Sequence, residues 1–208
     1  MNRNSTQILE NFDKLCTEYS MNVQLSSLQI KAVIYVSKQR SATLKYQKTQ
    51  STFVGNRLIS DSSNFLNSED DIPFLEAFPH IHTKLVYKQT TEIENHIKSL
   101  KSTLQTLQDI LNSMIQLENV AILRSKGTNL NVKSPVDISL IQTCEWLTHQ
   151  IIGYKIDLGE KLEFADTLDF RNIESLSKIQ SSWEICDSID FKEQVTIQER
   201  LKYLKLFG

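Results

Sequence analysis

The side chains best suited to chemistry in this 208-residue sequence are its four histidines, three cysteines and a periodic run of acids. His80 and His82 could ligate a metal ion, but residues two apart on a helix point to different sides. No cysteine or histidine follows them at partner spacing. His96 and His149 lie within helical patterns and are expected at the surface or its boundary. We therefore expect no metal site.

Five acids follow one another at a strict three-residue step: Asp157, Glu160, Glu163, Asp166 and Asp169. A catalytic or metal-binding cluster needs its carboxylates on one face, whereas a three-residue step walks around a helix. We interpret the run as a solvated acidic surface, with the cluster as the alternative.

Motifs of common enzymes are missing from the sequence. The five glycines never cluster into a phosphate-binding loop, and no Gly-x-Ser-x-Gly occurs. Cys16, Cys144 and Cys186 are far apart and odd in number, which indicates neither a disulfide framework nor a zinc knuckle but a reducing compartment. These absences disfavour an enzyme, and we expect no cofactor.

Composition favours an all-α fold. Five glycines and three prolines make turn formers scarce, which is typical of long helices rather than a many-stranded sheet. The net charge of −2 gives no global attraction to nucleic acid or to an anionic membrane. There is no apolar leader and no stretch approaching about 18 apolar residues, so we expect a soluble protein of the cytoplasm, the nucleus or both.

Residues 1–57 are predicted to form an N-terminal helical hairpin. An apolar stripe at helical spacing begins near Thr6, and the spacing loosens over residues 21–27. A second helix is expected from about Ser26 to near Lys48. Its apolar stripe contains Leu28, Ala32 and Tyr35 or Val36.

Residues 58–70 are rich in Ser, Asn and Asp and are predicted to be a flexible linker. Residues 71–208 are predicted to form a helical core, and the whole chain one domain. No Gly or Pro interrupts residues 80–126, which predicts one long central helix. Its coiled-coil seam consists of Ile97, Leu100, Leu104, Leu107, Leu111 and Met114. The expected architecture is an elongated helical bundle.

Three further helices are predicted after a loop at Gly127. The first is capped by Asp137 or Ser139 and carries Leu140, Cys144, Leu147, Ile151, Tyr154, Leu158 and Leu162 at helical spacing. Two shorter amphipathic helices follow, one around Leu176 and one around Leu201.

Charge is unevenly distributed along the chain. Residues 19–60 contain no acid and six bases, which are Lys31, Lys38, Arg40, Lys45, Lys48 and Arg57. Residues 157–193 hold ten acids against four bases. The two segments are either solvated faces or a partner surface. Because Tyr35 and Tyr46 are interleaved with the bases, a helical module that binds single-stranded nucleic acid is also an alternative.

The segment "FLEAFPHIHTKL" places two aromatics and a proline just before the long helix. Phe74, Leu75, Phe78 and Pro79 are candidate anchors for a partner, because aromatic anchors dominate interface energies. Alternatively, they fold a short helix back onto the long one. Trp146, Leu147 and Trp183 are further candidates for partner binding, although tryptophans are more often core residues.

The sequence "FLEAFPHIHTKLVYKQ" is similar to a region of the AIRIM family of ribosome maturation factors. Further matches follow in the same order within residues 74–183: Ser134-Pro135, Glu145-Trp146-Leu147, Tyr154-Lys155, Asn172-Ile173 with Leu176, and Trp183. Two features depart from the family pattern. The gap after Ser134-Pro135 is about a helical turn longer, and the segment after Trp146 is less basic.

The resemblance implies a non-catalytic adaptor or scaffold subunit of a complex built on AAA ATPases of the Drg or spermatogenesis-associated type. Such complexes act on precursors of the large ribosomal subunit and release shuttling maturation factors. The implied partners are the AAA ATPase subunits, a second small helical subunit and, indirectly, the pre-ribosomal particle, with no membrane. The seam alone would equally support a coiled-coil subunit of another assembly, such as a kinetochore, tether or replication complex.

Overall fold

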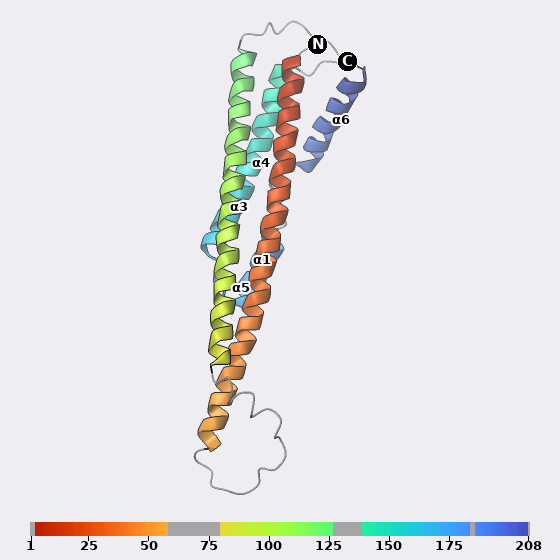
Figure 1. Cartoon of the computed structure of the whole chain (residues 1–208). Helices are drawn as coiled ribbons and strands as arrows, with labels where there is room; N and C mark the ends of the chain where they lie inside the picture. Colours follow the sequence, from red (N-terminus) through yellow and green to blue (C-terminus); the bar gives the residue numbers. More distant parts are fainter. Residues whose placement is uncertain (1–2, 58–79, 127–138, 184–185, 208) are drawn as a thin grey trace.

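The computed structural model describes residues 3–57, 80–126, 139–183 and 186–207, and every regular element in these segments is an α-helix (Figure 1). The helices are α1 (Arg3–Arg57), α3 (Ile81–Ser125), α4 (Leu140–Asp166), α5 (Ile173–Trp183) and α6 (Phe191–Phe207). The all-α prediction is confirmed. The predicted linker 58–70, the short helix before Pro79 and the loop at Gly127 lie outside the described residues.

Helix α1 contradicts the prediction of a hairpin within residues 1–57, because it is continuous over its whole length. Nothing in residues 21–27 ends a helix, since no glycine or proline occurs there. Side chains that face the core continue through this segment at alternating steps of four and three residues, namely Tyr19, Val23, Ser26 and Ile30. We call these residues, together with Phe12, Cys16, Val33 and Ser37, the core seam of α1. The apolar spacing loosens because Ser26 is polar while Met21 and Leu25 face outward.

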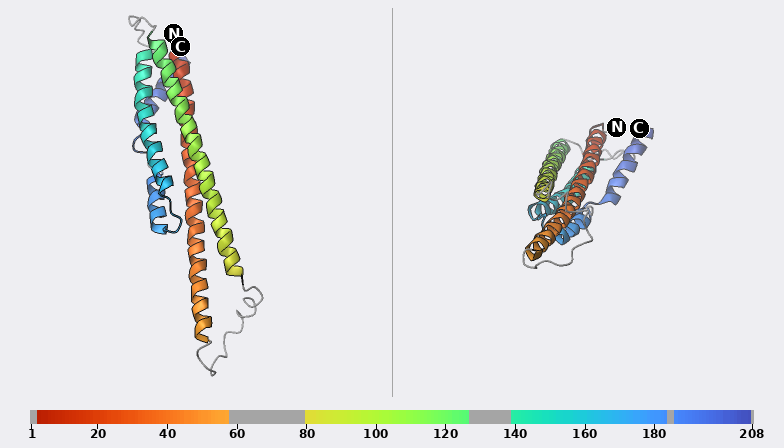
Figure 2. Two further views of the ribbon diagram at one scale, coloured as in Figure 1. Left: turned by 90° about the vertical axis from the view of Figure 1, so that its left-hand side faces the viewer. Right: turned by 60° about the horizontal axis from the view of Figure 1, so that its bottom comes forward.

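Helices α1 and α3 lie side by side as a long pair (Figures 1 and 2). The predicted long helix at about residues 80–126 is confirmed as α3. Its predicted seam is buried except for Ile97, which is half-buried. This seam packs against other helices of the same chain, mainly α1 and α4.

Helix α4 begins at the predicted cap Ser139, whose side chain accepts a hydrogen bond from the backbone N–H of Gln142. It packs along α3, and α5 and α6 then pack against α1. A single core cluster contains side chains from α1, α3, α4 and α5. The second cluster joins α6 to α1 and consists of Leu9, Ile197 and Leu201. No helix in the described segments is both long and apolar enough to span a bilayer.

Candidate partner interface

The predicted anchors Phe74, Leu75, Phe78 and Pro79 lie outside the described residues, and their role in partner binding stays a prediction. Leu147 and Trp183 are fully buried in the core of the chain itself. The indole N–H of Trp183 donates a hydrogen bond of 2.8 Å to Ser26 Oγ on α1. In this conformation both residues hold helices together and are not accessible to a partner.

Trp146 is half-buried and packs against the small cluster between α1 and α6. The guanidinium carbon of Arg200 lies 5.4 Å from the centroid of its ring, within the range of a cation–π contact. Trp146 therefore helps to hold α6 in place, and its predicted role with a partner stays a prediction.

The interpretation of the acidic run as a solvated surface is wrong at Asp157, which is buried. Its side chain is 1% exposed, while the other four acids of the run are exposed. Lys161, one helical turn further on and 2% exposed, donates to Asp157 Oδ1. The hydroxyl of Tyr19 donates to Oδ2 over 2.7 Å. The three-residue step placed one acid on the core face of α4, where a charge is tolerated only when paired.

The hydroxyl of Tyr19 and the thiols of Cys16 and Cys186 stay protonated at neutral pH. Burial raises the pKa of Tyr19, and the charge of Asp157 raises it further. Burial also raises the pKa of Cys16 to about 12 and that of Cys186 to about 11, although Lys161 acts in the opposite direction on Cys186. Since the thiolate is the nucleophilic form, neither cysteine is activated at neutral pH. The hydrogen bond of Tyr19 to Asp157 links α1 to α4, and that of Lys161 to Asp157 lies within α4.

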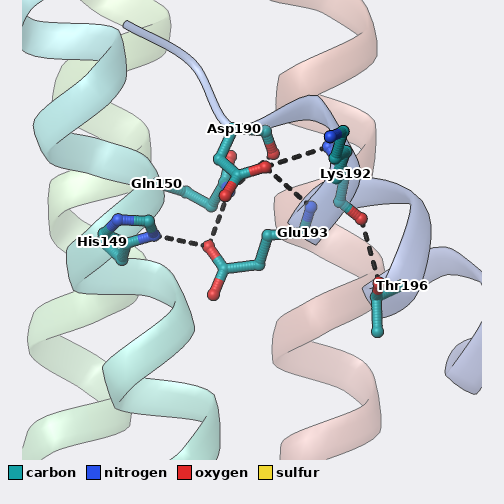
Figure 3. A network of polar contacts seen from close by, with 6 residues as sticks. All are labelled: His149, Gln150, Asp190, Lys192, Glu193 and Thr196. Atoms are coloured by element: carbon teal, nitrogen blue, oxygen red, sulfur yellow. Dashed lines mark hydrogen bonds and ion pairs between the residues drawn. The ribbon is translucent and has the colours of Figure 1, made fainter.

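A second polar cluster connects α4 to the start of α6 (Figure 3). His149 Nδ1 lies 2.7 Å from Glu193 Oε2, and Gln150 Nε2 donates to the same oxygen over 2.8 Å. Asp190 Oδ1 accepts from the backbone N–H groups of Lys192 and Glu193, which caps α6. The ligand atoms of His149, Asp190 and Glu193 lie within 4.8 Å of one another. Because these side chains already make hydrogen bonds within the protein, we interpret the cluster as a polar contact that holds the start of α6 against α4.

Helix α1 also carries an exposed apolar row that we call the outer seam: Met21 (58% exposed), Leu25 (51%), Leu28 (60%) and Tyr35 (64%). Half-buried Ala32 completes its alternating steps of four and three residues. Met21 falls between Tyr19 and Val23 of the core seam, and residues two apart on a helix point to nearly opposite sides. Helix α1 therefore carries one apolar seam toward the core and another toward solvent.

An apolar groove of about 470 Å³ adjoins the outer seam, between α1 and the start of α6. Its walls include Met21 from the seam and the exposed side chains of Phe191 and Val195. Its floor includes Tyr154 and Cys186. The outer seam and the groove are thus one continuous surface.

The sequence pattern does not predict this surface, because the expected hairpin places Leu28, Ala32 and Tyr35 or Val36 in the stripe of a separate helix. In the structure Val36 is buried and Tyr35 is exposed. The available signal was two interleaved heptad series along one uninterrupted segment.

In comparisons with known proteins, no family model matches the chain and no curated protein matches it significantly.

Proposed function

We propose that the chain is a non-catalytic adaptor or scaffold subunit of an AAA ATPase complex that acts in the maturation of large ribosomal subunit precursors. Its role there is in the release or recycling of shuttling factors, in the cytoplasm, the nucleus or both. The observation that carries the adaptor role is the outer seam with its groove. A continuous apolar surface of this kind marks an interaction site. The resemblance to the AIRIM family supplies the identity of the complex.

The polar interior supports a role without catalysis. Burial raises the pKa values of Tyr19, Cys16 and Cys186, so these three side chains offer no activated nucleophile. An adaptor needs no chemistry of its own, because the ATPase partner would hydrolyse the nucleotide. Its contribution is to hold another subunit in position.

Two other functions would also use exposed side chains of α1. A coiled-coil subunit of a kinetochore, tether or replication complex would also need an outer seam. A helical module for single-stranded nucleic acid is favoured by the exposed rings of Tyr35 and Tyr46 among the bases of α1. In that case, binding to RNA would weaken steeply as salt rises, and Tyr35→Ala would reduce it.

The first test is affinity purification of the tagged chain from its own cells at moderate salt, followed by mass spectrometry. We expect an AAA ATPase together with large-subunit precursors. Recovery of a different helical assembly without an ATPase would refute the proposed complex. A tagged chain with Leu25→Asp and Leu28→Asp is the control, because it should recover fewer partners at equal expression.

The predicted anchor before the long helix gives a second test. Leu75→Ala combined with Phe78→Ala is expected to weaken assembly with the ATPase while circular dichroism keeps its helical signal. A global loss of helix would instead assign these two side chains to the core.

A further inference from the structure

We propose that the outer seam of α1 and its adjoining groove dock one amphipathic helix of another protein, and that this helix carries acidic side chains along one flank. This inference rests on the proposed adaptor function, since it names the chemistry of the subunit that the adaptor holds. It is carried by three observations: the spacing of the seam, the charges beside it and the position of the groove.

The spacing of the outer seam is that of a coiled-coil interface. Met21, Leu28 and Tyr35 take position d of a heptad repeat, and Leu25 and Ala32 take position a. At 1.5 Å per residue, the seam is roughly 21 Å long. A partner with the same repeat could insert its apolar side chains between these residues along the whole length.

The lysines beside the seam favour a partner with acidic side chains. Lys31 and Lys38 lie at position g on one flank of the seam, and Lys45 continues this seven-residue series ten residues beyond Tyr35; all three are exposed. The opposite flank faces the chain's own fold, because Gln29 Nε2 donates to Ser99 Oγ of α3 over 2.8 Å and Val36 is buried. A docked helix would therefore meet the lysine series along its solvent-facing flank, where Glu or Asp would be favoured.

The same charges disfavour a second copy of this chain as the occupant. No acid occurs within residues 19–60. Two antiparallel copies of α1 would bring lysine flank against lysine flank. Two parallel copies would bring Lys31 and Lys38 against the neutral residues Val36 and Thr43. Neither arrangement sets an acidic side chain against these lysines, whereas an acidic helix does.

The groove gives the docked helix a defined end. It begins at Met21, the first residue of the seam, and Gln24 on its wall occupies the position seven residues before Lys31. The lysine series therefore ends where the groove begins. An apolar end of the partner helix would cover Phe191 and Val195 there, while its acidic flank follows Lys31, Lys38 and Lys45.

The test measures binding of two labelled synthetic helices to the full chain by fluorescence anisotropy. Both peptides are about four heptads long with Leu at a and d; one has Glu at e and g, the other Lys. We expect the Glu peptide to bind and the Lys peptide not to bind. The Kd of the Glu peptide should rise roughly tenfold or more between about 0.05 M and about 0.5 M NaCl, since salt screens exposed charges.

Variants locate the site. Leu25→Asp with Leu28→Asp should weaken binding of the Glu peptide at least roughly tenfold, which corresponds to about 1.4 kcal/mol. Leu123→Asp is the matched control, because Leu123 is an exposed leucine on α3. Lys31→Glu with Lys38→Glu should reverse the preference toward the Lys peptide. Lys98→Glu with Lys101→Glu, two exposed lysines on α3, should leave it unchanged. Circular dichroism checks that each variant keeps its helices.

Three outcomes would overturn the inference. The first is equal binding of both peptides, and the second is binding of neither. The third is a mass of two chains by light scattering that returns to one chain in Leu25→Asp with Leu28→Asp, because a second copy would then occupy the seam. The result is separable from the proposed complex. Binding of the Glu peptide without recovery of an AAA ATPase from cells would sustain the acidic partner and reject the complex.

Discussion

At the scale of single residues, the most informative group is the buried amine of Lys161. It donates to Asp157, lies 3.7 Å from Cys186 Sγ and stands 6.0 Å from the centroid of the Trp183 ring. Tyr19 satisfies the second carboxylate oxygen from α1. A buried ion pair adds little net stability, but removing one partner leaves an uncompensated charge. Any register of α1 against α4 that separates Tyr19 from Asp157 is therefore less stable, because it leaves a buried polar group without its partner.

Replacing Lys161 tests this account. Lys161→Met removes the cation and keeps an unbranched apolar side chain, so it should lower the free energy of unfolding in urea by about 3–5 kcal/mol. Adding Asp157→Asn removes the orphaned charge and should recover part of the loss. If the single variant is within about 1 kcal/mol of the natural chain, the pair has no such role.

His149 provides a pH-dependent contact. The hydrogen bond and the charge of Glu193 raise the pKa of His149, and Asp190 adds to the effect. The folded chain thus gains stability that is fully present below the unfolded value of about 6.5 and is lost as pH rises through the folded pKa. The gain is small, because His149 is 60% exposed and the pair is screened.

An NMR titration of the His149 ring measures this shift directly. We expect its pKa to lie above about 6.5 in the natural chain and to return toward that value in Glu193→Gln. A pKa at or below about 6.5 in the natural chain would show that the contact with Glu193 does not persist in solution.

At the scale of elements, helical spacing predicted α3, α4 and α5 well, because each buries one apolar stripe. It also predicted a helix at α6, although only Ile197 and Leu201 are buried among the side chains described there. Spacing failed for α1, since a helix with seams on two sides has no single stripe. It also failed for Asp157, because a three-residue step shows only that successive acids rotate around a helix. Whether one of them meets Lys161 and Tyr19 depends on the packing of α1 on α4, which a single sequence does not display.

The two glycines of α4 form a matched pair for a test of packing. A Cβ on Gly153 would meet the backbone oxygen of Ser188 at 2.4 Å, whereas a Cβ on Gly159 would meet nothing within 4 Å. Gly153→Ala should destabilise the chain by about 1–3 kcal/mol, because the backbone before α6 must move. Gly159→Ala should stabilise it by up to about 1 kcal/mol through helix propensity.

Thermal unfolding of both glycine variants checks the pair. The opposite signs are the important result, since both substitutions improve helix propensity and only Gly153→Ala meets another part of the chain. Equal stabilisation by the two variants would mean that Ser188 does not lie against α4 in solution. The hydrogen bond that Ser188 Oγ donates to Gly153 O should be lost with the contact in Gly153→Ala.

At the scale of the whole molecule, the bundle is uneven along its length. Among the described elements, only α1 and α3 reach the end where α1 finishes and α3 begins (Figure 2). The fully buried positions described in α1 end at Ser37, and those in α3 begin at Gln89. The outer seam lies within the well-packed part, so its helix is already formed before a partner arrives, which lowers the ordering cost of docking.

Hydrogen exchange followed by mass spectrometry tests this gradient. Amides of residues 41–48 and 81–88 should exchange at least roughly tenfold faster than those of residues 19–33 and 100–114, because local opening exposes fewer buried contacts at the two-helix end. Adding the Glu peptide should slow exchange further over residues 21–35 and leave residues 81–88 unchanged. Uniform protection along α1 would contradict the gradient. Protection by the peptide at the two-helix end alone would move the docking surface away from the outer seam.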